Sequence, residues 1–327
     1  MAEGERHWAW TISAPIIGGV AGLGLSATFL IAKDPSYGNA LFLLVPAAVG
    51  FVTSLILALT GERGFWDLFG YSALGLFYLG LGLMGFVAEG MICLLMASPL
   101  ALLPLAAGCG IGRGIANWAK PETNNLVPVL VLLALVTPSA YDGLYRPDRA
   151  AEVEYTSHVD IAARPELVWQ EIVSLGKLPP AHDWMSSLGL ACPETTELKG
   201  RCVGAERDCT LSTGPMKERI TAWEPGRRLG FVALQTPPPM RETNPFGEPH
   251  PAHLRQRYFR ILYGEFRLEA RGGGTRLYRT TRYEHRIRPV FYWTFLCNLA
   301  ADYAHRRVLD YLKAESEGRE TAKLAKR

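Results

Sequence analysis

The sequence predicts an α+β protein in which an N-terminal bundle of about five transmembrane helices precedes a domain of antiparallel strands and one long C-terminal helix. Two observations lead to this prediction. The residues before Arg149 contain 6 Lys and Arg and 9 Asp and Glu, whereas those from Arg149 onward contain 28 and 22. Hydrophobic residues also change pattern, from long uninterrupted runs in the first half to strand-like alternation in the second.

The apolar runs of the first half are long enough to cross a membrane, because a hydrocarbon core of about 30 Å needs about 20 helical residues. The run from Tyr71 to Ile111 would form a helix of about 60 Å, so it must fold back near Glu89. Glu89 is the single carboxylate in this run. Two interpretations of it stay open, a functional acid inside the membrane and a residue of an interfacial turn. The predicted spans are Thr11–Ala32, Ala40–Thr60, Tyr71–Ala88, Met91–Ile111 and Leu126–Ala140.

The basic residues of the first half predict the orientation of these spans. Five spans place Arg6, Arg63, Arg113 and Lys120 on one side of the membrane, against Lys33 in the short opposite loops. The positive-inside rule makes the first side cytoplasmic, so the C-terminal domain is expected outside the cytoplasm. If the fifth span, Leu126–Ala140, only lies on the membrane, the domain is instead cytoplasmic. The repeated glycines of the spans are interpreted as sites of close helix packing rather than as a phosphate loop, because they follow helices and not strands.

A strand that runs into a helix opens the second half. Apolar and polar residues alternate from Val153 to Ile161, and Pro165 and Glu166 then suit a first helical turn. The end of this strand, Ile-Ala-Ala-Arg-Pro-Glu-Leu-Val-Trp, resembles the opening of the SRPBCC superfamily of polyketide cyclase/dehydrase-like and START-like proteins. The resemblance covers roughly Val153 to Leu312. It implies the helix-grip fold, a curved antiparallel sheet around a long C-terminal helix with a ligand cavity between them.

A narrower resemblance extends to the apolar half. The segments Glu89-Gly-Met-Ile-Cys-Leu-Leu-Met, Thr213-Gly-Pro-Met-Lys-Glu and Pro237-Pro-Pro-Met-Arg-Glu resemble bacterial multi-span membrane proteins with a C-terminal SRPBCC domain. The sequence departs from that pattern at Arg282, where a tryptophan is expected. The resemblance implies a bacterial membrane protein, so we expect the inner membrane, and the orientation derived above would place the C-terminal domain in the periplasm. The expected parts are a transmembrane domain over residues 1–145, a helix-grip domain over 146–318 and a charged tail over 319–327.

Strand-like runs fill the rest of the second half, and the long loop Thr236–His253 interrupts them. Long loops in compact domains are usually functional or mobile. The further predicted strands are Val203–Leu211, Met216–Trp223, Arg228–Gln235, Arg255–Ala270 and Thr275–Arg288. A helix is expected from Pro289 to about Glu317. Its apolar positions, which should face the sheet, are Phe291, Phe295, Leu299, Tyr303 and Leu309.

Two charged side chains are predicted to point into the domain. Arg207 shares a strand face with Cys209, and Glu218 shares one with Ile220 on the next strand. Buried charges are costly unless they are paired. The pair is interpreted either as an anchor for a ligand head group or as a structural ion pair. The residues predicted to line or flank the ligand site are Trp184, Arg207, Cys209, Glu218, Glu242, His253, Tyr283 and Trp293.

The sequence favours a binding module over an enzyme. We expect a hydrophobic small molecule or lipid as ligand, in transport or sensing, with the lipid bilayer as the other partner. The alternatives are a cyclase, dehydratase or hydrolase that uses Glu218 or His253 as acid or base, and a structural or sensory protein without a ligand. No metal or cofactor is expected, because the carboxylates and histidines near His253 form no compact ligand motif. Nucleic acid is not expected either, since anionic lipids or solvent suit the arginine-rich strands of a tethered domain better.

Overall fold

The computed structural model describes residues 3–30, 37–118, 150–249, 251–254 and 258–324, together with positions 129, 133 and 137. The chain divides into two compact units. The helical unit comprises Met1–Asp148, Glu242–Ala252 and Ile287–Pro289, and the sheet unit comprises Arg149–Arg241, His253–Arg286 and Val290–Arg327. The predicted fifth span, 126–140, lies outside the continuously described ranges.

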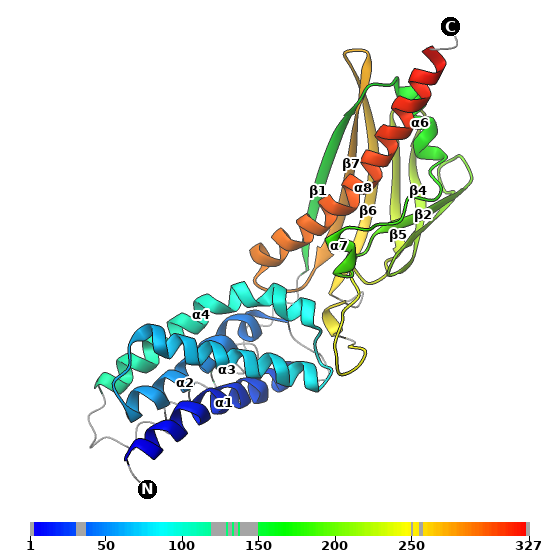
Figure 1. The fold of residues 1–327 in the computed structure, drawn as a ribbon. Helices are drawn as coiled ribbons and strands as arrows, with labels where there is room; N and C mark the ends of the chain where they lie inside the picture. Colours follow the sequence, from blue (N-terminus) through cyan, green and yellow to red (C-terminus); the bar gives the residue numbers. More distant parts are fainter. Residues whose placement is uncertain are drawn as a thin grey trace. The chain divides into compact units, whose positions relative to one another are not determined.

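Among its described residues, the helical unit has four helices that are long and apolar enough to cross a membrane (Figure 1). These candidate spans are Trp8–Leu30, Ala40–Thr60, Phe65–Gly85 and Met91–Trp118, and they agree with the first four predicted spans. The elements of this unit are α1 (Glu3–Leu30), η1 (Ala40–Leu44), α2 (Val45–Thr60), α3 (Phe65–Gly85) and α4 (Met91–Trp118).

Glycines allow two of these helices to pack backbone against backbone. A Cβ atom on Gly108 of α4 would collide with the carbonyl oxygen of Ala47 on α2. A Cβ atom on Gly50 of α2 would likewise collide with the carbonyl oxygen of Leu105 on α4. The packing interpretation of the glycines is therefore confirmed for α2 and α4, where small residues permit the close approach that apolar helices need in lipid.

The turn between α3 and α4 holds Glu89, and a segment from the second half of the chain packs on it. Glu89 is buried and accepts a hydrogen bond of 2.6 Å from the Tyr37 hydroxyl. Glu242 caps α4, because its carboxylate accepts hydrogen bonds from the backbone N–H groups of Ile92 (3.2 Å) and Cys93 (2.7 Å). Burial, together with the nearby charge of Glu242, raises the pKa of Glu89 to about 8.

Further hydrogen bonds hold the segments Glu242–Ala252 and Ile287–Pro289 at this end of the helical unit. The N–H of Met91 donates to the carbonyl oxygen of Thr243 at 2.9 Å. The Asn244 side-chain amide donates at 2.9 Å to the carbonyl oxygens of Met84 and Glu89. The segment Ile287–Pro289 is bonded nearby, where the N–H of Arg288 donates to the carbonyl oxygen of Tyr37 at 2.9 Å.

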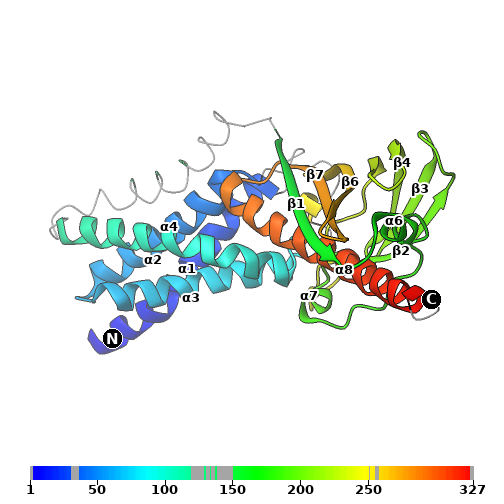
Figure 2. The same ribbon diagram turned by 90° about the horizontal axis from the view of Figure 1, so that it is seen from above.

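The sheet unit has one seven-stranded antiparallel sheet in the order β1-β7-β6-β5-β4-β3-β2. Its strands are β1 (Ala151–Ile161), β2 (Pro193–Lys199), β3 (Glu206–Leu211), β4 (Gly214–Glu224), β5 (Arg228–Gln235), β6 (Phe259–Arg271) and β7 (Gly274–His285). Its helices are α6 (Pro165–Val173), α7 (Trp184–Ser187) and α8 (Val290–Leu324), and the short η3 covers Ala252–Leu254. Figures 1 and 2 both show α8 running along one face of the sheet, which we call the inner face. This arrangement is the helix-grip fold, as predicted.

The core of the sheet unit is apolar at the C-terminal half of α8. There Leu309 and Leu312 are buried against Phe231 and Phe266 of the sheet and against Trp169 of α6. The members of this core on the two helices are Val168, Trp169, Ile172, Val308, Leu309 and Leu312.

The N-terminal half of α8 differs from the prediction. Phe291, Phe295 and Leu299 were expected to face the sheet, but they are 74%, 59% and 48% exposed. The reason is that this part of the helix turns polar side chains to the sheet instead. Thr294 bonds to His285 of β7 at 2.8 Å, and one turn later Asn298 accepts a hydrogen bond from a second β7 side chain. The contacts of these helical turns with the sheet are therefore made by Thr294 and Asn298, and the three apolar side chains lie beside this contact.

Candidate functional site

A charged pair lies on the inner face of the sheet. Arg207 of β3 and Glu218 of β4 stand directly opposite each other in the strand register. Their residues are only 4% and 1% exposed, and the Arg207 Nη1 donates to Glu218 Oε2. Both side chains therefore point inward and contact each other, as predicted.

Electrostatics keep this pair charged. Burial on its own would lower the pKa of Arg207, but the charge of Glu218 and its hydrogen bond hold that pKa above the ordinary value. The Arg207 guanidinium also stacks over the Phe231 ring, with 4.5 Å between its carbon and the ring centroid. Burial raises the pKa of the neighbouring Cys209 thiol, so this group stays protonated at neutral pH.

A second arginine, Arg279 of β7, shares the inner face. Its guanidinium carbon lies 5.0 Å from the ring centroid of Phe231 and 4.5 Å from that of Phe266. Burial, followed by repulsion from Arg207, lowers the pKa of Arg279 to about 10. The sequence analysis grouped Arg279 with the solvated arginines of the last strands, although its alternation with Leu277 and Thr281 could have placed it inside.

A glycine makes room for this arginine. Gly264 of β6 lies on the inner face, where a Cβ atom would collide with the Phe231 ring and would lie 2.8 Å from Nη1 of Arg279. A larger residue at this position would displace either the ring or the guanidinium.

A chain of hydrogen bonds joins α8 to the inner face beside Arg279. His305 of α8 lies 2.7 Å from the Thr281 hydroxyl through Nε2 and 3.0 Å from the Ser157 hydroxyl through Nδ1. Because the single Ser157 proton is donated to Asp302 at 2.8 Å, Nδ1 must carry the histidine proton and Nε2 must accept from Thr281. Burial, together with the charge of Arg279, lowers the pKa of His305 to about 3, so the ring is neutral at physiological pH.

The other residues predicted for the site lie in different surroundings. Tyr283 is buried, and its hydroxyl donates to Oδ1 of Asn298 at 2.7 Å. Cys209 is buried on β3, and Trp293 is buried on α8. Trp184, at the start of α7, is 70% exposed.

The two predicted site residues from the long loop have separate roles. Glu242 belongs to the helical unit and caps α4, as described above. His253 is buried in η3, and burial lowers its pKa to about 3. The sequence analysis missed the capping role because Glu242 and Cys93 are 149 residues apart.

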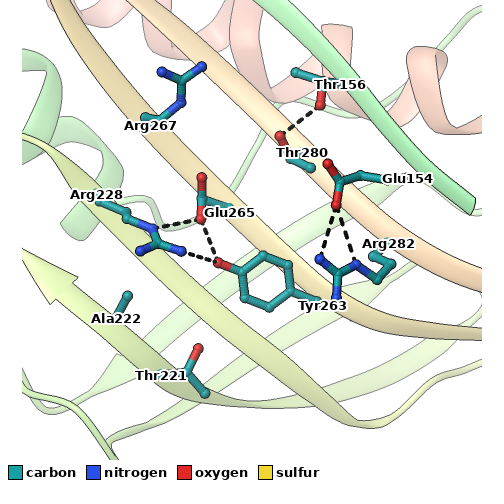
Figure 3. A pocket seen from close by; sticks show the side chains of 10 residues that line it. All are labelled: Glu154, Thr156, Thr221, Ala222, Arg228, Tyr263, Glu265, Arg267, Thr280 and Arg282. Atoms are coloured by element: carbon teal, nitrogen blue, oxygen red, sulfur yellow. Dashed lines mark hydrogen bonds and ion pairs between the residues drawn. The ribbon is translucent and has the colours of Figure 1, made fainter.

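The outer face of the sheet, opposite α8, carries a polar groove of about 430 Å³ (Figure 3). Arg228 donates to Glu265 at 2.7 Å and to the Tyr263 hydroxyl at 3.2 Å. Arg282 pairs with Glu154 at 3.1 Å. Arg228 and Arg282 are thus paired within the groove. No sequence pattern predicted a groove on this face. The lining residues are Glu154, Thr156, Thr221, Ala222, Arg228, Tyr263, Glu265, Arg267, Thr280 and Arg282.

Comparison with known proteins gives similarity to solved structures alone. No protein-family model matches the sequence, and no curated protein matches it. The Aha1 dimer from Colwellia psychrerythraea is 15% identical, with 49% of this chain and 96% of that chain covered and a TM-score of 0.29. Norcoclaurine synthase from Thalictrum flavum, in complex with dopamine and hydroxybenzaldehyde, is 12% identical, with 50% and 86% covered and a TM-score of 0.32.

A third structure, of an uncharacterized protein from Rhizobium leguminosarum, is 12% identical, with 51% of this chain and 97% of that chain covered and a TM-score of 0.34. Similarities at this level carry no functional argument. The helix-grip assignment is based on the strand order and on the position of α8.

The Arg207–Glu218 pair predicts a particular pattern of stabilities. Arg207→Leu or Glu218→Leu alone should lower the free energy of unfolding by about 3–5 kcal/mol, because each leaves one buried charge without its partner. The double variant should recover much of that loss. The measurement is urea-dependent alkylation of the buried Cys209 in the full-length protein, quantified by mass spectrometry.

The outer-face pair supplies a matched control. Arg282 and Glu154 also pair across two strands, but their side chains are 43% and 53% exposed. Leucine substitutions there should change the stability by about 1 kcal/mol or less. Equal losses at both pairs, or additive losses in the double variant of the inner pair, would contradict the proposed geometry.

Proposed function

We propose that the protein is a membrane-tethered binding module for a hydrophobic small molecule or a lipid, in transport or sensing. The four apolar helices support the tether, and the helix-grip domain supplies the binding surface. The observation that carries the proposal is the group of charged side chains above Phe231 and Phe266 on the inner face of the sheet. Apolar residues of similar volume usually stabilise a core at least as well as a buried ion pair does. Charges at this position are therefore better explained by ligand recognition than by folding alone.

The second candidate is an enzyme of the cyclase, dehydratase or hydrolase type. The hydrogen-bonded chain from Thr281 through His305 and Ser157 to Asp302 favours it, because such chains can move protons. The two residues predicted as acid or base do not support it. Glu218 is held by Arg207, and the pKa of His253 is near 3, whereas an acid or base works best with a pKa near the working pH. A binding module is the simpler proposal.

Native mass spectrometry of the full-length protein tests the binding proposal. We expect one apolar molecule per chain to remain bound after exhaustive exchange into a delipidating detergent. The Arg282→Leu variant on the outer face should keep this molecule, because its side chain lies away from α8. A protein that carries only exchangeable lipids, and that takes up nothing from a total lipid extract, would contradict the proposal.

The contacts of the helical unit also support a topology. The helices alternate in direction, so Tyr37 and the α3–α4 turn lie at the end of the bundle opposite Arg63. The segments Glu242–Ala252 and Ile287–Pro289 are bonded at the end with Tyr37. The strands and the helix α8 continue directly from these segments. With the basic residues on the opposite side, the positive-inside rule favours a C-terminal domain outside the cytoplasm, which is the periplasm of a bacterium.

Reporter fusions check this topology. Alkaline phosphatase fused after Arg327 should be active, and green fluorescent protein fused there should be dark. Fusions placed in the loop at Arg63 should give the reverse result. A fluorescent fusion after Arg327 together with an inactive phosphatase would place the domain in the cytoplasm and would overturn this part of the proposal.

A further inference from the structure

The inner face carries an excess of positive charge. Among the described residues of its strands, this face has two arginines, Arg207 and Arg279, and one carboxylate, Glu218. The carboxylate bonds to Arg207. The nearby His305 and Cys209 are neutral at physiological pH. The uncompensated charge therefore belongs to Arg279.

Another carboxylate lies further along α8 but is already engaged. Asp302 accepts a hydrogen bond of 2.6 Å from Nε of Arg306 and one of 2.8 Å from Ser157. It is four residues from Arg306 on the same helix, and the pair is partly exposed. It does not neutralise Arg279, since no carboxylate of the described residues lies within 4.0 Å of that guanidinium.

The hydrogen-bonding capacity of Arg279 is mostly unused. A guanidinium carries five N–H donors, yet Arg279 uses only Nη1, at 3.4 Å to the carbonyl oxygens of Glu265 and Thr280. Arginines on the outer face of the same sheet behave differently. Arg228 and Arg276 reach carboxylates at 2.7 Å and 2.6 Å. Arg279 is positioned by ring stacking and not by an ion pair.

The burial of Arg279 differs from that of its neighbours on the strand. Arg279 is half-buried, whereas Leu277 and Thr281, on either side of it on the same strand face, are buried. Gly264 on the neighbouring strand lets the guanidinium and the Phe231 ring pack closely, because a Cβ atom there would lie 2.8 Å from Nη1. Because Arg279 is only partly buried and Nη1 alone bonds to described residues, Nε and Nη2 remain available to a ligand group.

We infer that Arg279 binds the oxyanion of an amphipathic ligand, a carboxylate or phosphate head group on an apolar body. This inference rests on the proposed binding function and names the class of its ligand. A guanidinium fixed by two aromatic rings presents a planar fork that fits either oxyanion with two parallel hydrogen bonds. The anion supplies the missing counter-charge, and Phe231 and Phe266 provide apolar surface next to it.

Isothermal titration of the full-length protein in phosphatidylcholine nanodiscs tests the inference, with the heats of empty nanodiscs subtracted. The ligands are decanoate, decyl phosphate and decan-1-ol, which share one chain and differ in the head group. The wild-type protein should bind at least one of the anions about tenfold or more tightly than the alcohol, as a charge-assisted hydrogen bond requires. Arg279→Met should remove this preference and leave the affinity for the alcohol unchanged.

Two further variants sharpen the comparison. Arg279→Lys should keep part of the preference, because it retains the charge but loses the planar fork. Arg282→Met removes an arginine from the outer face and should change neither affinity. The melting temperature of Arg279→Met without ligand should stay unchanged or rise, since the lowered pKa means that the folded protein disfavours this charge.

The outcomes separate the two proposals. Equal binding of all three ligands, unaffected by Arg279→Met, would overturn the anion site and leave the binding module intact. No binding of any ligand would overturn both. A marked fall in the melting temperature of Arg279→Met would show that the arginine serves the fold, which would also overturn the inference. A preference for decyl phosphate over decanoate that Arg279→Met abolishes supports the site and identifies phosphate as its head group.

Discussion

Two opposite charges buried together on the inner face constrain the rest of the sheet unit. Arg207 and Glu218 face each other across β3 and β4, and either charge alone would be strongly destabilising. A slip of one residue between these strands would send one charge to the outer face, so the pair fixes the register. Phe231 extends the constraint to β5, because its ring lies under the guanidiniums of Arg207 and Arg279.

The helix α8 contacts the sheet differently along its length, with an apolar half and a polar half. At its C-terminal half, Leu309 and Leu312 close an apolar core against the sheet and α6. At the preceding turns, His305 bonds to the hydroxyls of Ser157 on β1 and Thr281 on β7, close to the charge of Arg279. Polar and charged groups in a core lower its stability, and natural proteins accept such a cost at ligand-binding sites. In the proposed function the helical unit is the tether, and its glycine contacts suit helices that pack within lipid.

Local patterns predicted the architecture, but they could not predict contacts between distant segments. Strand alternation was sufficient to place Arg207 and Glu218, and length and apolarity identified the four described helices. Alternation also places Arg279 on the inner face. Arginines occur on both faces of β7, however, and such a composition indicates solvent exposure. Phe291 was expected to face the sheet because it is apolar. The sequence does not show that β7 offers polar partners to this part of α8. Glu242 caps a helix 149 residues away, and no local pattern carries that information.

The central claim is that a ligand with an apolar body lies between the inner face of the sheet and α8. A long-chain fatty acid that carries a photoreactive diazirine, cross-linked to the full-length protein and mapped by mass spectrometry, tests this claim most directly. The account predicts cross-linked peptides from β6 and β7, within 259–285, and from α8, within 290–312. Cross-links confined to the helices α1 to α4 would contradict it, because they would report bilayer contact without a ligand in the domain.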